Sequence, residues 1–192
     1  MEFSELLIKE HEPIRRAISV LEGMASDAEN GRRINRNDVN ALLIFLHYFA
    51  DACHQAKEEA ILFPVLRQSQ VSLRVEGVIR EQLQDLLKEH SQERSLVEET
   101  QLALFSERPS EFIESARKLA KMLSEHVLKE EQVLFPIAKK ILTRKEGDEI
   151  LMRLEEADTK FGFSRRMLLV ELLQELEQKY SGTLPHPTRR SL

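Results

Sequence analysis

The sequence predicts an all-α protein: a four-helix bundle built from two αα-hairpins, followed by one or two further C-terminal helices. Two observations predict this fold. Glycine and proline occur only six times each in 192 residues, whereas residues that favour helices are abundant. In addition, two short motifs each occur twice. We expect one domain with an appendage: residues 1–142 as the bundle, 143–180 as a helical extension packed on it, and 181–192 as a loose tail.

The longer motif, H-x-x-K-E-E-x-x-L-F-P, occupies residues 54–64 and returns at residues 126–136. Each copy places a histidine and a glutamate four residues apart, so both side chains leave one face of a helix about one turn apart. The two pairs are His54 with Glu58 and His126 with Glu130. Imidazole and carboxylate groups on facing helices are typical of metal sites in the cores of helix bundles.

The shorter motif, K-E-H-x-x-x-R, occupies residues 9–15 and 88–94 and adds His11 and His90. The chain therefore contains two copies of one unit: a helix with a lone histidine, then a helix with His-x-x-x-Glu. A repeated unit often cannot bury its apolar face alone. We expect the two hairpins to pair, with their histidines and glutamates meeting across a pseudo-twofold axis.

Apolar residues at helical spacing predict the first helix from about residue 3 to residue 28. Pro13 lies inside this range and lacks the N–H that would bond the carbonyl four residues earlier. It should therefore kink the helix beside His11. The alternative is that the main helix starts near Glu12 and that the preceding residues form a separate turn.

A polar loop is expected over residues 27–37, and Asn37 or Asp38 is the expected N-cap of the second helix. That helix should run to about Arg67. Its repeated motif ends in proline, as does the motif of the fourth helix. Each proline either bends its helix and so shapes the floor of a site, or marks the last turn of a helix that is ending.

A break over residues 69–72 should separate the second and third helices, and the fourth should start near Pro109 and run to about Leu142. Two more helices are expected over residues 145–157 and 164–180. The last has an apolar face formed by Leu169, Leu172, Leu173, Leu176 and Tyr180. We expect this face to cover one side of the bundle; the alternative is a homodimer contact through the C-terminal helix.

Composition excludes several classes of function. The net charge is −5 and no basic face is evident, so the chain lacks the cluster of positive charge that is typical of nucleic-acid-binding proteins. The N-terminus lacks the pattern of a signal peptide. The longest uninterrupted apolar run, residues 41–46, is far shorter than the roughly 20 residues that span a bilayer. No motif places a Ser or Cys nucleophile for a hydrolase. We expect a cytoplasmic protein without nucleic-acid or membrane partners.

The repeated histidines and glutamates lie on the inner helical stripes. Buried, unpaired carboxylates are strongly disfavoured, and a metal pair would neutralise them. The alternative is a polar core without metal. Nitrogen and oxygen ligands without thiolate suit iron best, and manganese and zinc are also compatible. We therefore expect two iron ions bridged by the carboxylates of Glu58 and Glu130.

The order H…H-x-x-x-E…H…H-x-x-x-E, with Cys53-His54, Lys57-Glu58-Glu59 and Leu62-Phe63-Pro64, resembles the hemerythrin-like (HHE cation-binding) family over about residues 3–142. The resemblance implies an up-down-up-down bundle around a non-haem di-iron centre. Family members bind oxygen or are linked to nitric oxide, peroxide, iron sensing or repair of iron–sulfur centres. The residues carried over as metal ligands are His11, His54, Glu58, His90, His126 and Glu130.

The chain departs from the oxygen-carrying branch of that family at two positions. Arg94 stands where that branch has a second third-helix histidine, and Glu131 stands where it has a fourth-helix aspartate. With fewer histidine ligands, an open or water-filled position is expected. The resemblance then implies binding or weak redox handling of O2, NO or H2O2. The alternative is an iron- or oxygen-responsive module in which metal occupancy controls a partner surface.

Several other residues are candidates for supporting roles. His47, seven residues before His54, is expected to be either a further ligand, if the helix bends, or a support for a ligand. Cys53 is expected to be a packed thiol. Tyr48 is expected in the core, or alternatively along an approach to the metals.

Two arginines lie one turn after the lone histidines of the shorter motif. Arg15 and Arg94 are expected to pair with Glu59, Glu131 or a bridging carboxylate and so orient the ligands. The alternative is that they form solvated salt bridges at the rim of the bundle.

Overall fold

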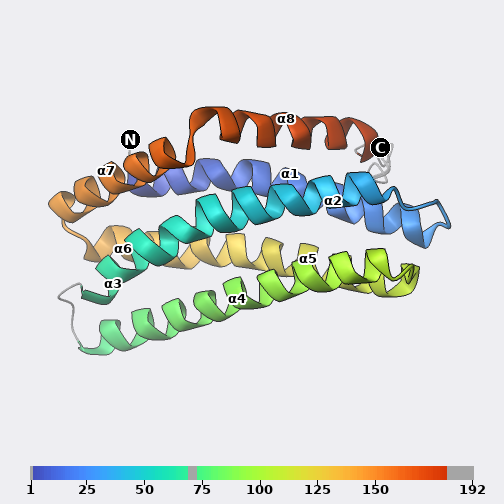
Figure 1. The fold of residues 1–192 in the computed structure, drawn as a ribbon. Helices are drawn as coiled ribbons and strands as arrows, with labels where there is room; N and C mark the ends of the chain where they lie inside the picture. The colour runs from blue at the N-terminus through green and yellow to red at the C-terminus, as the bar shows by residue number, and fades with distance from the viewer. Residues whose placement is uncertain (1, 69–72, 181–192) are drawn as a thin grey trace, which may run out of the picture.

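The computed structural model describes residues 2–68 and 73–180, and all secondary-structure elements in these ranges are helices. Four bundle helices lie side by side and alternate in direction (Figure 1), which confirms the predicted all-α, up-down-up-down bundle. The first is α1 (Phe3–Glu29); the second joins α2 (Arg36–Phe45), η1 (Leu46–Gln55), η2 (Glu58–Leu62) and α3 (Phe63–Gln68); the third is α4 (Leu73–Phe105); the fourth joins α5 (Pro109–Lys129), η3 (Glu130–Leu134) and α6 (Phe135–Ile141).

The observed helix ends differ from the sequence-based predictions at two points. Helix α1 continues through Pro13, so the alternative of a main helix starting near Glu12 is wrong. The N-cap of α2 is Asn35, not Asn37 or Asp38. The Asn35 side chain accepts hydrogen bonds from the backbone N–H groups of both expected caps, at 3.0 and 3.3 Å. Helix α5 begins at Pro109 as predicted, and the predicted break at residues 69–72 lies outside the described residues.

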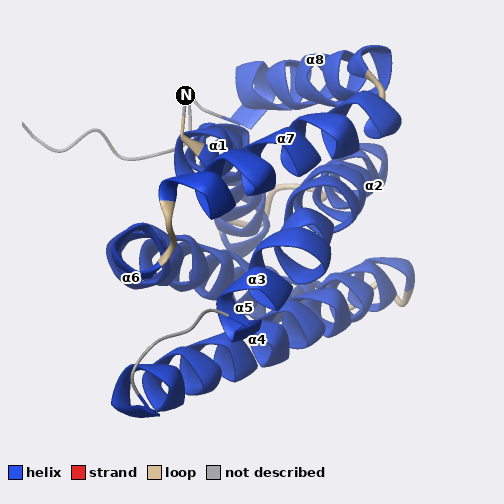
Figure 2. Ribbon diagram, turned by 90° about the vertical axis from the view of Figure 1, so that its left-hand side faces the viewer, coloured by secondary structure: helices blue, strands red, loops and turns tan. Residues whose placement is uncertain are grey.

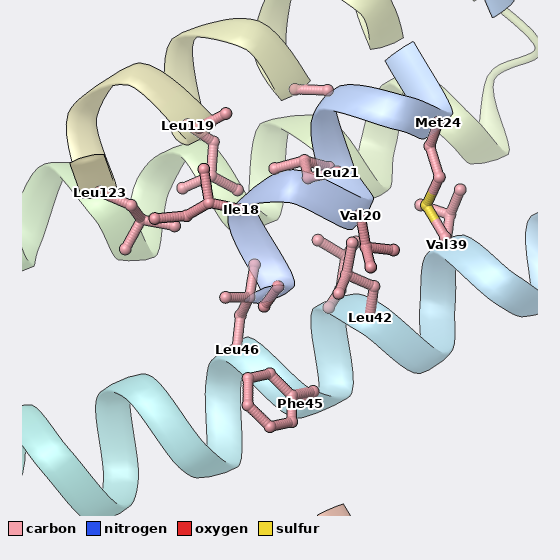
Figure 3. Close-up of a cluster of buried hydrophobic side chains, with 14 of the residues drawn as sticks. Ile18, Val20, Leu21, Met24, Val39, Leu42, Phe45, Leu46, Leu119 and Leu123 are labelled. Carbon is pink, nitrogen blue, oxygen red and sulfur yellow. The ribbon is translucent and has the colours of Figure 1, made fainter. Parts of the chain in front are cut away.

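The bundle holds two clusters of buried apolar side chains. In one of them, Ile18, Leu46 and Leu119 meet from three bundle helices (Figure 3). The other includes Leu7 and Leu62 and lies toward the opposite end of the bundle. Along the bundle helices the repeated histidines and glutamates lie where one cluster ends and the other begins. The polar residues therefore form one layer that is sealed by apolar packing above and below.

A wide, π-helical turn precedes each repeated proline. In η2 the N–H of Phe63 bonds the carbonyl of Glu58, five residues back, and in η3 Phe135 bonds Glu130 in the same way. Proline has no N–H and its ring would clash with the carbonyl four residues earlier, and a wider turn relieves that clash. Both helices continue beyond the proline as α3 and α6, so neither proline ends its helix.

Two C-terminal helices cover one side of the bundle. Helix α7 (Arg144–Phe161) packs on α1 and η2, and α8 (Phe163–Tyr180) packs on α1 and α2. The side chains of Leu169, Leu173 and Leu176 are buried against the bundle. Both helices lie on the side away from α4 (Figure 2). The expected tail, residues 181–192, lies outside the described residues, and no helix in the described ranges is long and apolar enough to cross a membrane.

Candidate metal centre

The six repeated side chains converge in the polar layer, and none is more than 3% exposed. The four imidazoles form two pairs. The Nε2 atoms of His11 and His54 are 3.1 Å apart, and those of His90 and His126 are also 3.1 Å apart. Each pair joins one histidine from the first helix of a hairpin with one from the second helix of the same hairpin. The structure therefore contains one imidazole pair per repeat.

Two carboxylates lie between the imidazole pairs. One oxygen of Glu130 lies 3.2 Å from Nε2 of His11, and its other oxygen lies 3.1 Å from Nε2 of His126. The Oε2 atom of Glu58 lies 3.7 Å from Nε2 of both His54 and His90. Each carboxylate thus reaches nitrogen atoms from both repeats, which is the placement that a bridging ligand requires.

Both carboxylates lack hydrogen-bond partners. All four oxygen atoms of Glu58 and Glu130 are buried without one. Burial, together with the charge of Glu130, raises the pKa of Glu58 well above its ordinary value. Leaving such groups unpaired costs free energy that bound cations would offset. Nitrogen and oxygen donors at these separations fit a pair of divalent or trivalent metal ions.

Each of the four converging imidazoles contacts, through its Nδ1 atom, a glutamate of another bundle helix. These Nδ1–carboxylate contacts are His11–Glu131 at 2.8 Å, His54–Glu10 at 3.0 Å, His90–Glu59 at 2.7 Å and His126–Glu89 at 2.9 Å. If Nδ1 carries the proton and donates it, the lone pair of Nε2 is free to face the centre of the cluster. The sequence reasoning missed Glu10 and Glu89, although both are the glutamate of the repeated K-E-H motif.

The two motif arginines hold two of these glutamates. Arg15 donates to Glu131 at 2.6 Å, and Arg94 donates to Glu59 and Asp51, both at 2.8 Å. The arginine side chains are 40% and 41% exposed. Each ion pair therefore lies at the rim of the bundle, as the alternative of solvated salt bridges predicted. Each also fixes a carboxylate that orients an imidazole, as the expectation of a supporting role predicted.

Comparison with known proteins identifies the family. A family model described as the hemerythrin HHE cation-binding domain matches residues 2–138. The chain belongs to the hemerythrin HHE cation-binding family. No curated protein and no solved structure matches the chain. The matched region contains the whole HHE cluster of histidines and glutamates, and it ends before α7 and α8 begin.

Three candidates lie apart from the HHE cluster. The His47 side chain is 57% exposed and lies 3.7 Å from Asp51, so it is not among the converging groups. Tyr48 is 45% exposed, so the expectation of core packing is wrong. Both belong to η1, where longer π-helical turns mean that a seven-residue spacing does not return to the same face. Cys53 is a buried thiol, as predicted, and burial raises its pKa to about 11.

Proposed function

We propose that this chain is a non-haem di-iron protein that binds or reduces a small ligand such as O2, NO or H2O2. The observation that carries the proposal is the pair of buried, unpartnered carboxylates between two imidazole pairs. Membership of a cation-binding family supports it independently. Manganese and zinc also suit these donors, and iron is proposed because mixed imidazole and carboxylate ligands serve its redox chemistry.

In this proposal each imidazole pair would hold one ion, and Glu58 and Glu130, which reach nitrogen atoms of both repeats, would be available to both ions. When bound, the ions would supply electrons and Lewis acidity to the small ligand. With two imidazoles and two shared carboxylates as its protein ligands, such an ion would have room to bind the small ligand. Arg94, which replaces a histidine of the oxygen-carrying branch, turns away to Glu59 and Asp51 and does not fill such a position.

The chain also protects the centre from bulk water. The phenylalanine of each L-F-P sequence stacks on an imidazole: Phe63 on His90 at 5.9 Å between ring centroids, and Phe135 on His11 at 5.8 Å. Both phenylalanines are 1% exposed. A dry, apolar surrounding strengthens electrostatic interactions inside the site and limits side reactions of a bound ligand.

Spectroscopy of the iron-loaded protein tests the proposal. Reduced protein exposed to O2, NO or H2O2 in turn should change its near-ultraviolet charge-transfer bands with at least one of them. If the ligand is reduced rather than only bound, the change should recur through repeated cycles with a supplied reductant. The proposal fails if iron-loaded protein gives the same spectrum with and without each ligand.

A second function, an iron- or oxygen-responsive module, is favoured by the packing of the C-terminal helices. Helices α7 and α8 lie outside the family match yet contact α1, η1 and η2, which carry His11, His54 and Glu58. For such a module, chelation should change helicity or oligomeric state while turnover is negligible. The alternative of a homodimer contact through α8 and the expected cytoplasmic location stay predictions.

A further inference from the structure

The C-terminal helices reach the support of one imidazole pair. Arg166 of α8 donates to Glu10 at 2.7 Å and to Asp158 of α7 at 2.6 Å. Lys57 also donates to Glu10, and it donates to Asp158 at 2.6 Å. Two carboxylates and two cations thus form one cluster between the bundle and its extension. The cations already neutralise these carboxylates, so the cluster is not a further metal site.

Glu10 connects this cluster to a proposed metal ligand. Its Oε2 atom contacts Nδ1 of His54 at 3.0 Å, and its Oε1 atom accepts from both Lys57 and Arg166. Glu10 is 2% exposed and Lys57 4% exposed. Ion pairs with so little solvent are screened weakly, so the position of Arg166 bears directly on the position of the Glu10 carboxylate.

Arg166 is itself held firmly. Beyond its two carboxylates, its guanidinium lies 3.3 Å from the Sγ atom of Cys53 and 5.6 Å from the centroid of the Phe49 ring. A planar guanidinium fixed by two ion pairs and an aromatic face has few alternative positions. The chain from α8 through Arg166 and Glu10 to His54 is therefore a continuous set of direct contacts.

Within the residues that the structure describes, the other repeat has no equivalent connection. There Glu89 binds His126 and accepts from Lys129, but the Lys129 side chain is 48% exposed, and a groove of about 600 Å3 lies over this pair between α4 and α5. The positions equivalent to Cys53 and Phe49 in the repeat are Glu125 and Lys121, which are 58% and 76% exposed. The apolar surface on which Arg166 rests is absent from this half.

We propose that Arg166 is a positioning residue for one of the two metal ions, the ion held by His11 and His54, and that the C-terminal helices thereby make the two metal positions unequal. This inference rests on the proposed metal pair. A group bound directly to a metal-binding imidazole, as Glu10 is to His54, typically contributes about 10- to 100-fold to metal affinity, and Arg166 acts through Glu10. Losing Arg166 should therefore weaken the binding of one ion and leave the binding of the other unchanged.

Chelator-driven metal release tests the inference. Full-length protein loaded with two Co2+ ions per chain is mixed with a chelator, and release is followed by absorbance. Arg166→Ala should accelerate the release of one ion by up to about 10-fold, because Lys57 still holds Glu10, and leave the release of the other ion as in the wild type. Arg166→Lys, which keeps the positive charge, should release that ion at a rate between those of the wild type and of Arg166→Ala. Lys129→Ala, the matched change beside Glu89, should leave the phase sensitive to Arg166 unchanged.

Proton NMR of the cobalt-loaded protein assigns the affected ion. The Nδ1 protons of the four imidazoles should be shifted by cobalt, and Arg166→Ala should speed the exchange with water of one of them. That resonance should be the one that Glu10→Gln shifts. A merely structural role of α8 would instead be mimicked by Leu173→Ala, which loosens the packing of α8 but leaves the contacts of Arg166 in place.

The outcomes separate the inference from the proposed function. If Arg166→Ala binds two ions and releases both at the wild-type rate, or releases both faster by the same factor, the inference is wrong but the proposed function is unaffected. An effect of the same size in Leu173→Ala also overturns it. A wild-type chain that does not bind two ions at the cluster overturns the proposed function together with the inference.

Discussion

Glu58 is the side chain whose position is hardest to explain without bound cations. It is fully buried, has no hydrogen-bond partner, lies 3.7 Å from an imidazole of each repeat, and its pKa is raised well above its ordinary value by burial and by the charge of Glu130. A carboxylate kept in such a place raises the free energy of the metal-free fold. The same placement lets it contact both ions of a pair. Function and stability therefore oppose each other at this residue.

Replacing this carboxylate should separate the two effects. Glu58→Gln should bind fewer than two ions per chain, while the metal-free variant should be more stable than the metal-free wild type, by about 1–3 kcal/mol. Metal analysis and urea unfolding of chelated protein measure the two quantities. Glu125→Gln, at a 58% exposed side chain, should change neither. Full metal content in Glu58→Gln would contradict the bridging role.

A second buried carboxyl interrupts the symmetry of the core. Glu93 is 4% exposed and accepts from the amide of Gln55, whereas the equivalent positions of the other repeat are Ile14 and Val127. Burial raises the pKa of Glu93 to about 7, from 4.5. The unfolded chain therefore releases this proton at lower pH than the folded chain, and stability should fall as pH rises from about 4.5 to 7.

Glu93→Gln should remove that pH dependence. The unfolding free energy of the variant, relative to the wild type, should rise by on the order of 3 kcal/mol between pH 4.5 and 7, which is the pKa difference of about 2.5 times 1.36 kcal/mol. Urea unfolding at three pH values and equal metal content measures it. A difference that is constant with pH would show that Glu93 keeps an ordinary pKa.

At the residue scale the sequence predicted the converging groups but not their supports. The six repeated histidines and glutamates were found because spacing on a helix directly gives a shared face. Glu10 and Glu89 were missed because each precedes a histidine of its own helix but contacts the histidine of the neighbouring one. That partnership depends on how two helices are placed against each other, which periodicity does not contain.

At the scale of elements, the wide turns before Pro64 and Pro136 place the glutamates. Glu58 and Glu130 each begin a π-helical segment, and each gives its carbonyl to an N–H five residues later. An extra residue in the turn changes the direction of the side chains before it relative to those after it, so each glutamate is rotated relative to the helix beyond its proline. The sequence indicated an irregularity at both prolines, but a missing N–H does not determine whether a helix bends, widens or ends.

Pro64→Ala tests this dependence. The restored N–H can bond the carbonyl of Ala60, which accepts from Arg153 at 3.3 Å in the wild type. The turn should tighten to an α-helix and rotate Glu58 away from the cluster, so metal affinity should fall by about 10-fold or more. Pro109→Ala, at the first turn of α5, is the matched control and should bind metal normally. Unchanged affinity in Pro64→Ala would show that the wide turn does not depend on the proline.

At the scale of the whole molecule, the duplicated hairpins give two nearly equal halves, and the C-terminal helices cover one of them. The polar layer divides an otherwise apolar bundle into two clusters. Because ligands from all four bundle helices meet in that layer, metal binding should contribute to the free energy of folding. The repeats in the sequence predicted the symmetric part. The asymmetry arises from contacts with α7 and α8 and from positions where the two repeats differ, such as Cys53 and its equivalent Glu125.

The most direct test of the metal pair is anomalous diffraction from crystals of iron-loaded protein at the iron absorption edge. We expect two anomalous peaks in the polar layer, one beside Nε2 of His11 and His54 and one beside Nε2 of His90 and His126, with Glu58 and Glu130 between them. Crystals of protein shown to contain iron that give no peak in this layer, or peaks only at the surface, would contradict the account.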